Sequence, residues 1–306
     1  MKAKDIAGLL ALSAFWGGSF LLIRIAAPVL GPVVLVELRV LLAGLLLVLY
    51  SLATKRPLNL RKYWLIYLMI GLLNSAIPFT LIATSELHLT AGLAAILNAT
   101  SPLFGAVVAA IWLKETLTLK KVIGLVLGLV GVCVVMGWSP LPLTLTIILS
   151  VVASLTAAAF YGIGGAYIKI YAHGTNTVAI ATCSQLGAAL FLLPLTVVAP
   201  MQHTPSLLVA LAVAALALVS TAIGYLIYFS LIANVGPTRA LTVTFLAPVF
   251  GVLWGSVFLG EVLTVSTVLG FAIILLGTGF VTGIIKFGRK KEAVSEEVQE
   301  QQEIAQ

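Results

Sequence analysis

Two charged residues, Glu37 and Arg39, stand inside the otherwise apolar stretch 32–53. A charge within an apolar helix is costly, so it is usually placed against a partner charge, a water-filled cavity or a solute. Residues two positions apart do not face each other, so each needs a separate partner. Arg24 and Glu86 are expected at a similar depth. Two interpretations stay open: a vestibule that binds a charged or zwitterionic solute, with Glu37 as a proton-binding group, or a static charge network at the helix ends.

Uncharged polar and aromatic side chains recur in the other apolar stretches, several of them at spacings of three or four residues. Such spacings place them on one face of each helix. They could line a cavity with hydrogen-bonding groups and aromatic walls, or they could bond neighbouring helices to one another. Together with the two charged residues, the candidate substrate-binding side chains are Trp16, Ser19, Glu37, Arg39, Asn74, Asn98, Ser101, Tyr161, Gln185, Thr221, Tyr225 and Tyr228.

The composition indicates a chain that lies in lipid. Of its 306 residues, 61% are hydrophobic and 9% are charged, whereas soluble domains carry about 25% charged residues. A membrane-spanning helix needs about 20 apolar residues, and in hydrocarbon its backbone groups must pair internally. We therefore expect an all-α integral membrane protein with ten transmembrane helices, at 5–27, 32–53, 63–84, 89–113, 121–137, 143–168, 175–199, 206–232, 236–259 and 265–285.

Basic residues are distributed unevenly between the connections. With ten crossings and the N-terminus inside, every lysine and arginine other than Arg24 and Arg39 falls in an inner segment. Cytoplasmic loops carry such an excess. The sequence therefore predicts a multi-pass protein of the cell membrane with both termini in the cytoplasm. The basic clusters are expected to contact anionic lipid and not nucleic acid.

The second half of the chain repeats the first. At an offset of 146 residues, Glu115-Thr-Leu-Thr118 matches Glu261-Val-Leu-Thr264, and at an offset of 145, Ala14-Phe-Trp-Gly17 matches Ala159-Phe-Tyr-Gly162. The offset contains five predicted helices, an odd number, so the two halves would cross the membrane in opposite directions. Inverted repeats of this kind occur in secondary transporters, where the solute binds near the midplane between the halves.

These motifs give the chain a family resemblance. The five-plus-five division, the Phe-Trp-Gly-Gly-Ser-Phe run at 15–20 and the paired Pro…Glu segments at 102–115 and 248–261 resemble the EamA branch of the drug/metabolite transporter superfamily. The resemblance covers nearly all of residues 5–285. It implies a ten-helix carrier with a central cavity and alternating access. Members include exporters of amino acids and metabolites, as well as some uptake carriers.

Two residue pairs at equivalent positions suggest roles in the mechanism. Pro102 and Pro248 each remove a backbone hydrogen bond within a predicted span, so they could be hinges between rocking halves or fixed kinks. Glu115 and Glu261 stand just before new helices. We expect each to be stabilised by the dipole of the helix that follows it.

Motifs for several other functions are missing from the sequence. It has no HExxH, no GxSxG in a suitable context and no GxxxxGK[ST] phosphate loop. Cys133 and Cys183 lie in apolar runs outside any CxxC pair. We therefore expect no enzymatic activity, no metal site and no cofactor. GxxxG pairs such as Gly124/Gly128 permit close helix contact, within the bundle or in a homodimer.

The sequence predicts three parts: a five-helix half at 1–137, an inverted five-helix half at 143–285 and a disordered cytoplasmic tail at 286–306. The expected function is secondary transport of an amino acid, metabolite or drug-like compound by alternating access, with export favoured by the resemblance. An uptake carrier of the same fold stays open. A channel and a non-transporting membrane protein stay open with less support. The expected partners are a small-molecule substrate and the lipid bilayer, and a homodimer is left open.

Overall fold

The computed structural model describes residues 2–137, 144–236, 240 and 242–285, so the predicted tail lies outside the described residues. These residues form helices joined by short connections, with no strand among them. Two of the helical segments, η1 and η2, are π-helices. The elements are α1 (Ala3–Leu30), α2 (Pro32–Ala53), α3 (Leu60–Gly71), η1 (Leu72–Ala76), α4 (Ile77–Ser85), α5 (Ala91–Asn98), α6 (Ser101–Trp112), α7 (Leu119–Gly137), α8 (Leu145–Tyr171), α9 (Thr177–Val198), α10 (Leu207–Ala215), η2 (Leu216–Ile223), α11 (Gly224–Val235), α13 (Val243–Leu259) and α14 (Val265–Thr282).

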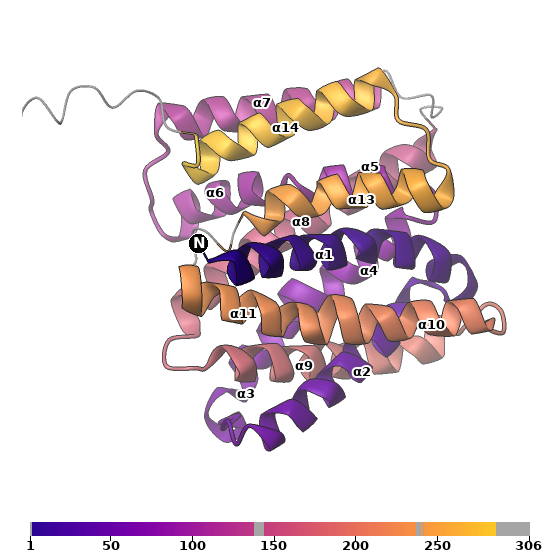
Figure 1. The fold of residues 1–306 in the computed structure, drawn as a ribbon, viewed down its shortest axis with the longest axis vertical. Helices are drawn as coiled ribbons and strands as arrows, with labels where there is room; N and C mark the ends of the chain where they lie inside the picture. The colour runs from indigo at the N-terminus through magenta and orange to yellow at the C-terminus, as the bar shows by residue number, and fades with distance from the viewer. Residues whose placement is uncertain (1, 138–143, 237–239, 241, 286–306) are drawn as a thin grey trace, which may run out of the picture.

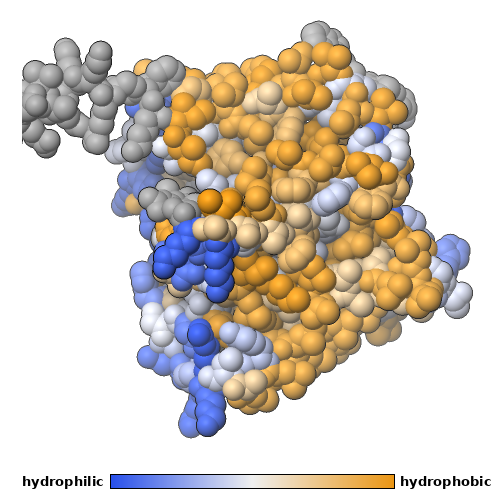
Figure 2. All heavy atoms as spheres, viewed as in Figure 1, coloured by the Kyte–Doolittle hydropathy of each residue, from blue (hydrophilic) through white to orange (hydrophobic). Residues whose placement is uncertain are grey.

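The helical stretches are long and apolar. Among the described residues, nine of them have at least 18 residues and suffice to cross a membrane, and α13 is a shorter apolar helix of 17 residues. Large hydrophobic side chains such as Leu49, Val126 and Val257 point outward. Figure 2 shows a wide hydrophobic surface, with hydrophilic residues gathered on the side where Figure 1 marks the N-terminus. The expected all-α integral membrane fold is confirmed, while the count of ten spans stays a prediction.

The helix ends form two faces of the bundle. We call one of them the basic face, because Lys2, Arg56, Lys121 and Lys169 lie at the helix ends that form it. The opposite face is formed by the ends of α1, α4, α9 and α13 and by the starts of α2, α5, α10 and α14.

The helices depart from the predicted spans in their interiors. The third and eighth spans, Leu60–Ser85 and Leu207–Val235, contain η1 and η2. The fourth span is interrupted at Ala99 and Thr100. Pro102 therefore lies in the first turn of α6 and not in mid-helix. Backbone N–H groups in the first turn have no hydrogen-bond partner within the helix, so proline breaks no bond there. Pro248 lies inside α13, as expected.

The sequence repeat reappears in the way the helices pack. α1 lies on α13 through Gly17, where an added Cβ would be 2.7 Å from the Gly251 nitrogen. α8 lies on α6 through Gly162, where an added Cβ would be 2.7 Å from the Gly105 nitrogen. An offset of 145 residues relates Gly17 to Gly162, and an offset of 146 relates Gly105 to Gly251, so the two contacts are equivalent. The offset of 146 also relates η1 to η2. Each contact joins a helix of one half to a helix of the other.

Equivalent helices run in opposite directions. The Glu261 carboxylate, just beyond the end of α13, accepts hydrogen bonds from the backbone nitrogens of Ala91 (2.7 Å) and Gly92 (2.9 Å) at the start of α5. α13 and α5 pack side by side. The end of one helix therefore meets the start of the other, which makes them antiparallel. The offset of 146 residues relates α13 to α6, which follows α5 within the fourth predicted span, so the equivalent fourth and ninth spans run in opposite directions.

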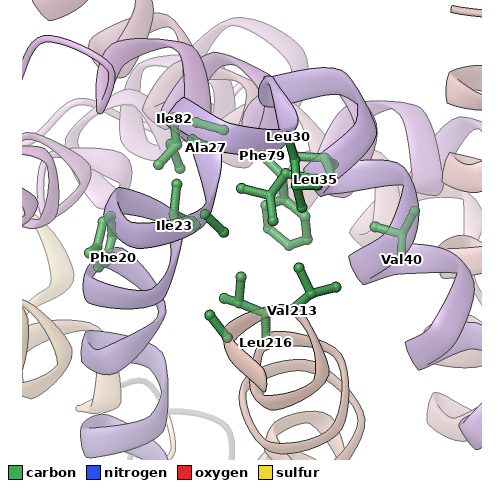
Figure 3. Packing of buried hydrophobic residues seen from close by; sticks show 14 of the residues in the cluster. Phe20, Ile23, Ala27, Leu30, Leu35, Val40, Phe79, Ile82, Val213 and Leu216 are labelled. Atoms are coloured by element: carbon green, nitrogen blue, oxygen red, sulfur yellow. The ribbon is translucent and has the colours of Figure 1, made fainter. Parts of the chain in front are cut away.

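Buried hydrophobic residues are divided unequally between the two faces. One large cluster fills the half of the bundle next to the opposite face, where Ile23, Leu35 and Leu216 come together from α1, α2 and η2 (Figure 3). Near the basic face the buried hydrophobics form smaller separate clusters, one between α1, α11 and α13 and another between α3 and α9. The two halves are therefore packed together more extensively at the opposite face.

Candidate substrate-binding site

Arg39 is a buried cation in the first half of α2, with 6% of its surface exposed. Its Nε donates a hydrogen bond to the hydroxyl of Thr221 in η2 (3.0 Å), and its guanidinium carbon lies 3.9 Å from the centre of the Phe79 ring. The hydroxyls of Tyr161 and Tyr225 are near enough to interact with its charge. The guanidinium is thus held by one hydrogen bond and by a cation–π contact.

Gln185 of α9 occupies the equivalent place in the second half. An offset of 146 residues relates Arg39 to Gln185 and Ser75 to Thr221. Gln185 Nε2 donates to the hydroxyl of Ser75 in η1 (3.0 Å), just as Arg39 donates to Thr221. The Tyr225 hydroxyl lies beside both Ser75 and Gln185. Two equivalent hydrogen bonds therefore cross between the halves, one from a guanidinium and one from a neutral amide.

The π-helical segments place the two hydroxyls that accept these bonds. The Thr221 hydroxyl also donates to the Leu216 carbonyl five residues earlier in η2 (2.8 Å). Insertion of one residue into a helix widens a turn and redirects side chains, and such segments are frequent at functional sites. Ser75 and Thr221 occupy equivalent positions in η1 and η2, so the same distortion serves both halves.

Trp16 and Tyr228 form a second group, with ring centroids 5.4 Å apart. The indole nitrogen of Trp16 donates to the backbone carbonyl of Ser220 in η2 (3.1 Å). Phe229 packs against both Tyr228 and Tyr225, at centroid distances of 6.0 and 5.9 Å. This aromatic series connects the Trp16 group to the surroundings of the buried guanidinium.

The remaining candidate residues make contacts of other kinds. The Ser19 hydroxyl bonds to a carbonyl of its own helix (2.6 Å), and the Ser101 hydroxyl bonds to the carbonyl of Asn98 (2.6 Å). The Asn74 amide packs against the backbone of α8. Glu37 is buried, and its Oε2 has no partner among the described residues. The structure brings together Trp16, Arg39, Tyr161, Gln185, Thr221, Tyr225 and Tyr228, and contact of any of them with a solute stays a prediction.

A further charged group lies at the opposite face. Glu86, just after α4, is fully buried, and neither carboxylate oxygen has a hydrogen-bond partner within the described part of the chain. The Arg24 guanidinium contacts the backbone carbonyl of Glu86. Arg24, Glu261 and Arg39 are all near enough to interact with the Glu86 charge. Of the expected pairings with the charges of α2, Glu86 lies near Arg39 but beyond ion-pair distance, and Arg24 contacts Glu86.

The equivalent residues Glu115 and Glu261 have different surroundings. The expectation that the following helix stabilises each of them is wrong for Glu261, which binds the start of α5, while Thr264 caps α14. Glu115 lies at the basic face and accepts hydrogen bonds from Lys169 (2.9 Å) and Lys121 (3.2 Å). These hydrogen bonds, of which the one from Lys169 has the larger effect, hold the pKa of the Glu115 carboxyl below its usual range.

A comparison with models of protein families shows to which family the chain belongs. Two segments of the chain, residues 4–137 and 148–283, match the family model described as the EamA-like transporter family. The chain belongs to the EamA-like transporter family. The family model is matched once in each half of the chain, and the resemblance expected from the sequence motifs is confirmed. This EamA-like protein is accordingly a multi-pass membrane protein of a transporter family.

Similar proteins are named as transporters. Bacillus subtilis (strain 168) "Uncharacterized transporter YvbV" is 28% identical over 278 residues, which cover 90% of each chain. Escherichia coli (strain K12) "Uncharacterized inner membrane transporter YedA" is 30% identical and covers 90% of the EamA-like protein and 89% of its own chain. A "Probable amino-acid metabolite efflux pump" of the same strain is 27% identical, with coverages of 90% and 94%. One solved structure shares the fold, with a TM-score of 0.67 at 17% identity and coverages of 93% and 98%.

Hydropathy and helical spacing miss two neighbours of the Arg39 site in this EamA-like chain. Ser75 is a small polar residue without a helical stripe, but applying the repeat offset to Thr221 would have identified it. Phe79 looks like any apolar residue of a span, and its role depends on the tertiary contact with Arg39. The sequence does identify Glu86, by its expected depth beside the charges of the second span, and the structure adds that Glu86 is fully buried.

Proposed function

We propose that this EamA-like protein is a secondary transporter that moves a small organic solute across the cytoplasmic membrane by alternating access between two inverted halves. The observation that carries the proposal is the pair of equivalent hydrogen bonds, Arg39 to Thr221 and Gln185 to Ser75, between the halves in the bundle interior. Inverted halves that meet at a shared central site can expose that site to either side by rocking.

The proposed direction is export, with the basic face in the cytoplasm. The lysines and arginines at the helix ends support this orientation, since cytoplasmic loops are rich in basic residues. The name of one relative, an efflux pump, supports export. The large buried cluster and the bonds of Glu261 to α5 hold the two halves together at the opposite face, which supports a carrier whose described conformation opens toward the cytoplasm.

Counterflow in proteoliposomes tests this function. The solute is chosen by screening amino acids and related metabolites for a rise in the thermal unfolding midpoint, because a ligand of the folded state stabilises it. Liposomes loaded with the unlabelled solute are expected to accumulate labelled solute transiently, and only when they contain the protein. Unitary currents without counterflow would instead identify a channel.

Substitution at Trp16 and Asn98 tests the assignment of the site. Trp16→Phe removes the N–H that holds the indole ring to the Ser220 carbonyl, and Asn98→Ala removes a side-chain amide. Each change is expected to weaken solute binding by about 1 kcal/mol, which raises the half-saturating concentration in counterflow about fivefold. Thr156→Ala is the matched control, since that exposed hydroxyl bonds only to its own helix. If both site variants behave like the control, neither residue contacts the solute.

A further inference from the structure

Arg39 carries a charge that no contact within the described chain neutralises. The ion pairs among the described residues join Glu115 to Lys121 and to Lys169. Glu86 interacts with Arg39 only from beyond ion-pair distance, and it interacts more strongly with Arg24. An unpaired charge within an apolar bundle is costly, so it is retained where it serves a function.

The repeat shows that the structural hydrogen bond at this position does not require a charge. Gln185 makes the equivalent bond to Ser75 with a neutral amide, between the equivalent pair of helices. An amide at position 39 would therefore suffice to join α2 to Thr221. The guanidinium provides what the amide lacks, a positive charge and two terminal nitrogens.

The geometry around Arg39 leaves those terminal nitrogens available. Only Nε bonds to protein, through Thr221, and the planar group stacks on Phe79. Neither terminal nitrogen forms a hydrogen bond with the described residues, and neither is a fully buried, unpartnered atom. Two parallel N–H groups at the end of a fixed guanidinium match the two oxygens of a carboxylate. The hydroxyls of Tyr161 and Tyr225 lie in the same environment.

We propose that Arg39 binds the carboxylate of the transported solute, so that the solute is an organic carboxylate, either a monoanion or a zwitterion. This inference rests on the proposed transport function. A single guanidinium balances one negative charge, so a phosphate dianion would leave its second negative charge uncompensated in the apolar bundle. The Phe79 ring and the two tyrosine rings provide an apolar wall for the body of the solute.

Pairs of probes that differ only in the acid group test this inference in the purified full-length protein. The first pair is 3-phenylpropionate and 3-phenylpropanamide, the second is L-leucine and L-leucinamide, and methyl phosphate is a separate probe. At least one carboxylate is expected to raise the thermal unfolding midpoint, while its amide and methyl phosphate leave the midpoint unchanged. Equal shifts from acid and amide, a shift from methyl phosphate or no shift from either carboxylate would overturn the inference without any variant being needed.

Two variants of Arg39 then locate the effect. R39Q installs the residue found at the equivalent position 185, so it is expected to fold with an unchanged midpoint and to lose the carboxylate shift. R39K keeps the positive charge but lacks the two parallel terminal N–H groups. It is expected to weaken carboxylate binding about tenfold, since the bidentate contact is lost. A carboxylate shift that persists in R39Q overturns the inference. Counterflow of a neutral or cationic solute would also overturn it while leaving the proposed transport function intact, and the absence of counterflow for every solute would instead count against that function.

Discussion

Glu261→Ala is expected to lower the free energy of unfolding by about 2–4 kcal/mol. The Glu261 carboxylate accepts two hydrogen bonds, from Ala91 and Gly92, and bonds of this charged type contribute about 1.5–3 kcal/mol each. Its negative charge also lies at the positive end of the α5 dipole. The side chain is only half-buried, and solvent weakens charged hydrogen bonds, so the expected loss lies near or below the lower end of the combined range of about 3–6 kcal/mol. Denaturant unfolding of the purified protein in detergent measures the change.

The equivalent substitution Glu115→Ala is the control for this prediction. Glu115 bonds to Lys169 and Lys121 at an exposed site, and exposed ion pairs contribute about 0–1 kcal/mol. Glu261→Ala should therefore destabilise the protein clearly more than Glu115→Ala does. Equal effects of the two substitutions would mean that the contact between Glu261 and α5 does not hold the two halves together.

Gly162→Ala is expected to destabilise the protein by about 1–3 kcal/mol, the usual cost of overpacking a close contact. The added Cβ would lie 2.7 Å from the Gly105 nitrogen and 2.9 Å from the Phe104 carbonyl carbon. These are backbone atoms of α6, so relief requires the helices to move apart. Gly17→Ala is expected to have a similar effect, because its Cβ would meet the backbone of α13 in the equivalent way. Thermal unfolding and monodispersity in detergent measure both variants.

Gly165→Ala is the matched control three residues further along α8. Nothing lies within 4 Å of its added Cβ, and alanine is favoured over glycine in a helix by about 1 kcal/mol. We therefore expect this variant to be as stable as the parent or slightly more stable. Destabilisation by Gly165→Ala equal to that by Gly162→Ala would show that loss of glycine, and not the contact between α8 and α6, causes the effect.

The sequence predicts the spans and the repeat because both depend on local patterns. The apolar runs must be helical in lipid, and the ends of α2 coincide with the predicted span 32–53. The predicted contact of Gly124 and Gly128 within the bundle agrees with the packing of both residues against Gly277 of α14. Hinge motion at Pro102 and Pro248, and a homodimer, stay predictions.

Features that depend on tertiary packing could not be predicted from the sequence. Hydropathy is the same for an α- and a π-helical turn, so η1 and η2 are invisible in it. The partner of Glu261 is set by α13 lying antiparallel to α5, which no local signal reveals. No local signal reveals the contacts of Arg39 with Thr221 and Phe79 either. The repeat offset does relate the bond with Thr221 to the bond between Gln185 and Ser75.

Cysteine labelling of two equivalent connections tests most directly whether the halves are inverted around a shared site. Lys114→Cys and Val262→Cys place thiols at exposed positions after α6 and α13, in a background that carries Cys133→Ser and Cys183→Ala. With intact cells and an impermeant maleimide, we expect V262C to react directly and K114C to react only after the membrane is permeabilised. Reaction of both thiols from the same side of the membrane would contradict the inverted architecture, and with it the proposed transport mechanism.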